Sequence, residues 1–291
     1  MAFSATDAVF EGFRVVRRRP MTLVWWSLFY MVVMALAMAV IGGSLIRLVN
    51  AAEALETAGT PSPEDFMPIL QLYMGIFAVV LPVSLAAGAA IYAAVSRAVL
   101  RPEESRFGYL RLGMDEVRVL VVTLVLGLGF IALSGVMFML VGIVGGLAAS
   151  LEAPWLWLVA VLLGLAVRLS LAVPITVGER RIAILDSFRL TRGRFWPLLG
   201  MAILAGVLSL VVGLLGSLVL TPLQFMTGGM TRLQDLEGAA LAEILQTAWP
   251  MIAVWIVSNA ILSALQVAVV YAPFSAAYRA IKGSGGEAVS A

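Results

Sequence analysis

The sequence predicts an all-α polytopic membrane protein with six transmembrane helices. First, 62% of its 291 residues are hydrophobic and only 12% are charged, whereas a soluble domain carries about 25% charged residues. Second, the apolar residues form runs of about 20 or more, the length that an α-helix needs to cross about 30 Å of hydrocarbon. Third, the basic residues gather in alternate loops, as they do in membrane proteins of fixed orientation.

Six runs are long enough to span a bilayer. Prolines inside such runs, for example Pro82 and Pro174, are compatible with spans because neighbouring helices can satisfy the freed backbone groups. We do not expect the N-terminus to be a cleavable signal, because Asp7 and Glu11 precede the basic cluster and the first run is too long for a signal peptide. The predicted spans are about 21–46, 68–96, 118–149, 154–178, 196–222 and 248–275.

Sixteen of the nineteen basic residues fall on one side of these six spans. The loops of the other side hold only Arg47 and Arg232, and Arg168 lies inside the fourth run. By the positive-inside rule the basic side, with both termini, is predicted to be cytoplasmic. On the opposite side, residues 47–67 look irregular, and residues 231–246 have the apolar spacing of a short amphipathic helix on the membrane surface.

The segments before spans one, three and five resemble one another when they are aligned on Arg14, Arg111 and Arg189. Each reads as an amphipathic elbow helix in the membrane interface, followed by a transmembrane hairpin. The interpretation is three repeats within one membrane domain, at about 5–99, 100–178 and 179–282, and then a flexible tail over 283–291. The alternative is that any basic residue before a span aligns with any other.

Arg168 is the basic residue that the sequence places within a span, about ten residues from its cytoplasmic end. A cation in hydrocarbon costs a few kcal/mol, so it pairs, snorkels or faces a polar interior. Arg168 is therefore a candidate contact for a lipid phosphate or substrate anion, or else a partner of Glu179. Further candidates lie on the basic side. The candidate contacts for lipid or another anion are Arg14, Arg111, Arg189 and Arg192, and the candidate structural partners of these arginines are Glu179, Asp115 and Asp186.

The residues usually needed for catalysis are scarce. The chain has no His and no Cys, which removes the usual general base, thiolate chemistry and the commonest metal ligands. We find no phosphate-binding loop and no zinc-protease motif, so the sequence predicts no catalytic residue, metal or cofactor. The elbow arginines stand directly against spans, which favours anionic phospholipid over nucleic acid as their partner.

The stretch from Val167 to Gly200 resembles a recurring segment of a family of bacterial six-span proteins, the YciC-like proteins and the membrane domain of some glycerophosphodiester phosphodiesterases. The sequence departs from the family at Gly178, where an aliphatic residue is expected, and in the loose match of Ile182 to Asp186. The resemblance implies six spans in the bacterial cytoplasmic (inner) membrane and no defined biochemical role. It rests on Arg168, Ser170, Leu171, Pro174, Glu179, Ser187, Leu190, Thr191, Gly193 and Trp196.

Three functions are consistent with these observations. The leading hypothesis is a non-catalytic inner-membrane protein that binds anionic lipid, another membrane protein or a second copy of itself through its basic elbows; replacing Arg14, Arg111 and Arg189 would then weaken lipid retention. The second is a permease or lipid translocase with a site near Arg168. The third is a lipid-headgroup enzyme, which would need Asp115, Glu116 and Glu179 gathered around a divalent ion.

Overall fold

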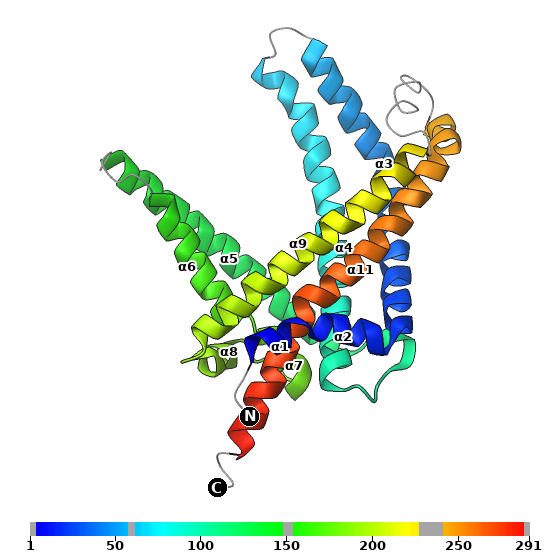
Figure 1. Cartoon of the computed structure of the whole chain (residues 1–291). Coiled ribbons are helices and arrows are strands. Elements are labelled where there is room, and N and C mark those ends of the chain that lie inside the picture. Colours follow the sequence, from blue (N-terminus) through cyan, green and yellow to red (C-terminus); the bar gives the residue numbers. More distant parts are fainter. Residues whose placement is uncertain (1–3, 58–61, 148–153, 227–240, 288–291) are drawn as a thin grey trace. The chain divides into compact units, whose positions relative to one another are not determined.

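The structure is a computed structural model that describes residues 4–57, 62–147, 154–226 and 241–287. The described residues are helical with short connections and contain no strand (Figure 1). The prediction of six membrane-spanning helices is confirmed, since six helices are long and apolar enough to cross a bilayer. These are Pro20–Leu55, Pro63–Leu100, Arg106–Ile143, Val159–Glu179, Phe195–Pro222 and Trp249–Gly283.

The helices follow one another in the order α1 (Ala5–Val9), α2 (Glu11–Arg18), α3 (Pro20–Thr57), η1 (Pro63–Phe66), α4 (Met67–Leu100), η2 (Arg106–Tyr109), α5 (Met114–Leu147), α6 (Pro154–Leu169), α7 (Ala172–Glu179), α8 (Ile184–Thr191), α9 (Phe195–Met226) and α11 (Leu241–Glu287). Each long helix has the apolar composition expected of a lipid-exposed span.

Three expectations about the ends of the spans need correction or fall outside the structure. The segment 47–67 is not irregular throughout, because α3 continues to Thr57 and η1 begins at Pro63. The tail predicted from residue 283 is still helical to Glu287. The amphipathic helix predicted over 231–246 lies outside the described residues as far as position 240, and its remainder is the first part of α11.

The chain forms two compact units, and α3, α4, α9 and α11 run through both. The first unit contains residues 1–23, 88–211 and 265–291, with the basic segments and all of α5, α6, α7 and α8. Part of its core joins α4, α5 and α7 through Ala89, Ala93, Val119 and Val177. These small side chains allow helices to approach closely where no hydrophobic effect drives them together.

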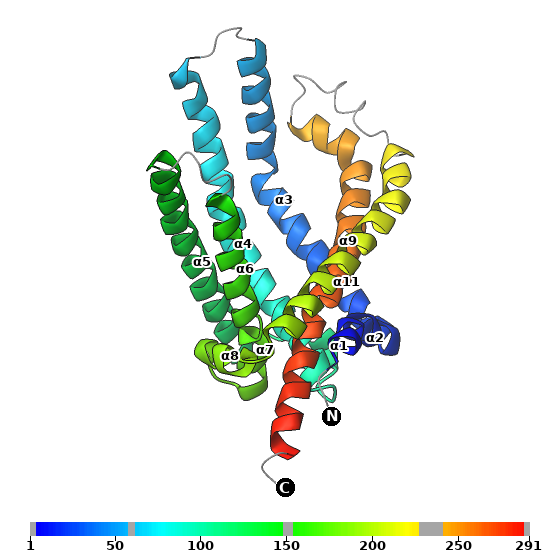
Figure 2. The ribbon, with the colours of Figure 1, turned by 60° about the vertical axis from the view of Figure 1, so that its left-hand side comes forward.

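Within the first unit, α4 and α11 make further specific contacts. The rings of Tyr92 and Tyr271 stack with centroids 4.1 Å apart, and the hydroxyl of Ser275 donates to that of Ser96 at 3.2 Å. Figures 1 and 2 both show α5 and α6 as an antiparallel pair, with α8 beside the C-terminal end of α6.

The second unit contains residues 24–87 and 212–264 and consists of the other parts of the four long helices. Its α9 and α11 approach each other closely at Gly216, where an added Cβ atom would lie 2.7 Å from a methyl group of Leu262. The short helix η1 before α4 begins with a capping box, in which the carboxylate of Asp65 accepts from the backbone N–H of Ser62 at 2.8 Å.

The three predicted elbows differ in structure. The first and third are helices, α2 and α8, which contain Arg14 and Arg189. The second is not a helix at Arg111, because residues 110–113 are not helical and η2 before them passes through left-handed backbone at Phe107, Gly108 and Tyr109 (φ 49°, 64° and 65°). The prediction of an elbow helix around Arg111 is therefore wrong.

Candidate functional site

The first elbow helix, α2, is fixed to α11 by close packing and an ion pair. Gly12 lies against the α11 backbone, and a Cβ atom at this position would be 2.3 Å from the carbonyl oxygen of Ala268. Beside it, the buried carboxylate of Glu11 pairs with Arg279 at 3.0 Å, and Arg279 also donates to the carbonyl of Val99 at 2.8 Å. Segments 268 positions apart in the chain are thereby held together.

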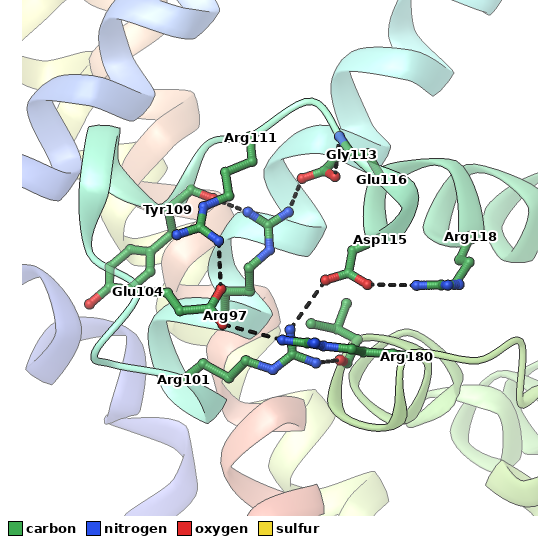
Figure 3. A network of polar contacts seen from close by, with 11 residues as sticks. Arg97, Arg101, Glu104, Tyr109, Arg111, Gly113, Asp115, Glu116, Arg118 and Arg180 are labelled. Atoms are coloured by element: carbon green, nitrogen blue, oxygen red, sulfur yellow. Dashed lines mark hydrogen bonds and ion pairs between the residues drawn. The ribbon is translucent and has the colours of Figure 1, made fainter.

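The second basic segment is organised around Arg97, whose side chain is only 1% exposed. Its guanidinium donates to the carboxylate of Glu116 and to the backbone carbonyl of Tyr109 (Figure 3). Glu116 also accepts from the backbone N–H of Gly113 at 2.9 Å, which caps the first turn of α5. This buried pair fixes the non-helical loop between α4 and α5.

A second layer of ion pairs in Figure 3 surrounds this buried pair. Asp115 binds Arg101 at 3.2 Å and Arg118 at 3.0 Å. Glu104 binds Arg111 at 2.9 Å and Arg180 at 3.5 Å. The carboxylates at this place therefore serve to hold arginines of different segments together.

The fourth predicted span, about 154–178, corresponds to Val159–Glu179 in the structure, but it is divided into two helices, α6 and α7. The helix breaks at Ser170 and Leu171, between α6 and α7. Pro174 explains the break, because it has no N–H for the carbonyl of Ser170 and its ring would collide with that carbonyl in a continuous helix.

Two hydroxyl groups of α8 satisfy the backbone groups that this break leaves without helical partners. Ser187 donates to the carbonyl of Arg168 at 2.7 Å and accepts from the N–H of Leu171 at 3.2 Å. Thr191 adds a longer bond of 3.4 Å to the same carbonyl. After Thr191 the helix α8 stops, and Gly193 adopts the positive φ of +78° that commonly ends a helix.

The carboxylate of Glu179, at the end of α7, does not bind Arg168. It accepts from Tyr278 at 3.2 Å and pairs with Lys282 at 3.4 Å, both on α11, and with Arg181 at 2.7 Å. Gly178 fits here because a Cβ atom would lie 2.6 Å from the Tyr278 ring, so the packing of Tyr278 explains this departure from the resembled family.

Arg181 connects Glu179 to the third elbow, since it also pairs with Asp186 of α8 at 2.5 Å. Hydrogen bonds to Asp186 and then to Glu179 raise the pKa of Arg181.

The candidate lipid contacts fall into two groups. Arg14, Arg111 and Arg189 lie at least partly exposed in ion pairs, with Asp7 at 3.2 Å, Glu104 at 2.9 Å and Asp186 at 3.9 Å respectively. Arg192 and Arg168 make no ion pair with any described residue. The guanidinium of Arg168 instead lies 6.0 Å from the ring centre of Phe195.

The sequence did not single out several residues that shape this end of the molecule. The Arg97–Glu116 and Glu11–Arg279 pairs join positions 19 and 268 apart, and no local pattern indicates such partners. On the basic side of the part of the chain that the structure describes, further arginines are exposed or half-exposed and have no ion pair: Arg17, Arg18, Arg19, Arg106 and Arg194. Of these, Arg19 donates a hydrogen bond to the carbonyl of Pro102 at 2.6 Å.

Three ion pairs share one spacing, with a carboxylate three residues before an arginine. They are Glu11–Arg14 at 3.5 Å, Asp115–Arg118 at 3.0 Å and Asp186–Arg189 at 3.9 Å. Each lies in a helix, α2, the first turns of α5, and α8, so the helical member in the second segment is Arg118 and not Arg111.

No family model matches the chain, and no curated protein or solved structure shows significant similarity to it. The resemblance of residues 167–200 to the YciC-like segment therefore stays a prediction. The structure does place several of those residues close together in the fold, because Ser187 and Thr191 of α8 bond to the end of α6, Pro174 lies in the first turn of α7, and Gly193 follows the end of α8.

Proposed function

We propose that this six-span protein is a non-catalytic membrane protein that binds anionic phospholipid headgroups through its basic end. In this proposal the basic end faces the cytoplasm of a bacterial cell and the spans cross its cytoplasmic (inner) membrane. The positive-inside bias of the loops supports this orientation.

The observation that carries the proposal is an excess of positive charge that the protein does not neutralise itself. The basic side holds sixteen Arg and Lys residues but nine of the chain's seventeen carboxylates. Most of these carboxylates are taken by arginines that hold segments together. We define the basic surface as the exposed or half-exposed arginines of this side, apart from the groove residue Arg168, whose side chains make neither an ion pair nor a hydrogen bond with a described residue: Arg17, Arg18, Arg106, Arg192 and Arg194.

Exposed apolar side chains stand among these arginines. Leu112 is 97% exposed next to Arg111, and Leu185 and Trp196 are each 76% exposed on either side of Arg192. Such side chains are costly in water but favourable at the level of the acyl boundary, where arginines can reach phosphates. Each basic residue near an anionic surface adds about 1 kcal/mol of attraction.

The repeat proposal is strengthened by the shared ion-pair spacing, in a register different from the one the sequence suggested. Three segments share one pattern over their first six positions: an apolar residue, an acidic residue, any residue, an apolar residue, Arg and an apolar residue. They are residues 10–16 (FEGFRVV), 114–120 (MDEVRVL) and 185–191 (LDSFRLT). The third position of each contacts another segment: Gly12 packs on α11, Glu116 binds Arg97, and Ser187 binds the end of α6. We propose that these segments are the corresponding parts of three repeats.

No observation favours the lipid-headgroup enzyme over this function. Its three required carboxylates have separate cationic partners, Asp115 with Arg101, Glu116 with Arg97 and Glu179 with Lys282. In the described residues no group of three potential metal ligands is found.

Lipid selectivity tests the proposal. In vesicles of phosphatidylcholine containing spin-labelled phosphatidylglycerol or phosphatidylcholine, we expect the wild type to associate more strongly with phosphatidylglycerol. Replacing Arg17, Arg18, Arg192 and Arg194 by Gln removes four charges that make no internal ion pair, so we expect this preference to fall severalfold while the fold is retained.

The matched control is Arg47→Gln, which removes an arginine that bonds only within α3, to Gly43 and Ser44. It should leave the preference unchanged. An equal preference in the four-arginine variant and the wild type would rule the proposed function out.

A further inference from the structure

A groove in the first unit combines apolar walls with one cation. It has a volume of about 500 Å³ and is open on one side, with walls from α5, α6, α8 and α9. Its apolar lining includes Leu133, Leu165, Phe188 and Phe195, and Arg168 is the ionisable residue among those that line it. The volume falls within the range of about 300–1,000 Å³ that is usual for ligand sites.

Arg168 has no anionic partner in this groove. The sequence suggested Glu179, but that carboxylate is bound by Arg181, Tyr278 and Lys282. The described contact of the Arg168 guanidinium is the face of Phe195, at 6.0 Å from the ring centre. This cation–π contact is much weaker than a bidentate hydrogen bond to a phosphate.

The position of Arg168 is fixed by its backbone. Because Ser187 and Thr191 of α8 both donate to its carbonyl oxygen, Arg168 lies at the level of the third elbow helix and not several turns deeper, where its place in the predicted span put it.

We propose that the groove binds one anionic phospholipid, with its phosphate on Arg168 and an acyl chain along Leu133 and Leu165. Charge complementarity selects this occupant. The groove offers one cation without an anionic partner beside apolar walls, and a phospholipid of this kind has an anionic headgroup and apolar chains. The depth at which the phosphate would lie in the membrane rests on the proposed function, which places α8 among the lipid headgroups. The residues that line the groove are different from those of the basic surface.

Native mass spectrometry tests this site on the full chain, released from nanodiscs made of equal parts of phosphatidylglycerol and phosphatidylcholine. We expect the wild type to retain one phosphatidylglycerol. The Arg168→Gln variant removes a charge-assisted contact, so the fraction of protein carrying that lipid should fall about tenfold or more.

A second variant tests the groove without touching the charge. Gly164 lines the groove, and a Cβ atom there would meet no atom within 4 Å. The Gly164→Leu variant therefore places a larger apolar side chain in the groove and should also expel the lipid. Gly206→Leu is its control, because Gly206 also faces open space in α9 but does not line the groove, and retention should be unchanged.

The outcomes separate this site from the proposed function. Loss of the lipid in both groove variants, with retention in the four-arginine variant of the basic surface, supports an independent site. Unchanged retention in Arg168→Gln, equal retention of phosphatidylcholine by the wild type, or a dimer in place of bound lipid would each overturn the site, whatever the spin-label experiment shows.

Discussion

Arg97 illustrates at the residue scale how this protein uses buried charge. It is 1% exposed and bound to Glu116, whose side chain is 9% exposed. Removing two charges from water costs several kcal/mol per ion, and mutual attraction repays this cost only when the geometry and the other hydrogen bonds are good. Here Arg97 also holds the carbonyl of Tyr109, and Glu116 also caps α5, so the pair specifies the path of the 101–113 loop.

We therefore expect Glu116→Gln to lower the free energy of unfolding by about 3–5 kcal/mol, because it leaves the Arg97 charge buried and uncompensated. The double variant Arg97→Met, Glu116→Leu should recover much of this loss, since it removes both charges. Thermal unfolding in a mild detergent measures both. A double variant no more stable than Glu116→Gln would show that the pair acts through its hydrogen bonds to the backbone instead.

At the scale of elements, the stability of the broken α6–α7 segment depends on a neighbouring helix. The two free backbone groups at the break are satisfied by one side chain, that of Ser187. Pro174 removes one helical hydrogen bond near the break, and α8 satisfies the two backbone groups that the break leaves free.

Ser187→Ala should thus destabilise the protein by about 1–3 kcal/mol, the usual cost of leaving buried polar groups unsatisfied, with a lower midpoint of thermal unfolding. Ser217→Ala is the matched control, because the exposed Ser217 hydroxyl bonds only to Leu214 in its own helix. Equal midpoints for the two variants would contradict the role assigned to Ser187.

The same elements show what sequence reasoning can and cannot reach. Pro174 is evident in the sequence, but a proline inside a span does not by itself predict a break, because it is often tolerated. No local sequence pattern predicts that Ser187 accepts a hydrogen bond from the N–H of Leu171. In the sequence, Leu110-Arg111-Leu112 matches the apolar-Arg-apolar pattern around Arg14 and Arg189. The shared pair of Asp115 and Arg118 became evident only when the helix proved to begin at Met114.

At the scale of the whole molecule, the number of spans was predictable because hydropathy alone decides it. Water cannot solvate runs of more than 20 apolar residues, whatever tertiary contacts they make. For the candidate site, the sequence predicts that arginines on the basic side contact lipid, but it does not identify which of them are free to do so. Which arginines remain free depends on which carboxylates are already occupied, and pairs such as Glu11–Arg279 join opposite ends of the chain.

The central claim, that the basic elbows lie in the membrane interface, is tested most directly by the depth of a spin label at Leu185. The chain contains no Cys, so Leu185→Cys gives a single labelling site, and Glu103→Cys gives an exposed reference in the α4–α5 loop. In phosphatidylglycerol vesicles we predict that the label at 185 collides readily with oxygen and is shielded from a water-soluble nickel complex, as expected for a helix about 5–10 Å into the headgroup and acyl boundary. A label at 185 that is as accessible to nickel as the one at 103 would contradict the account.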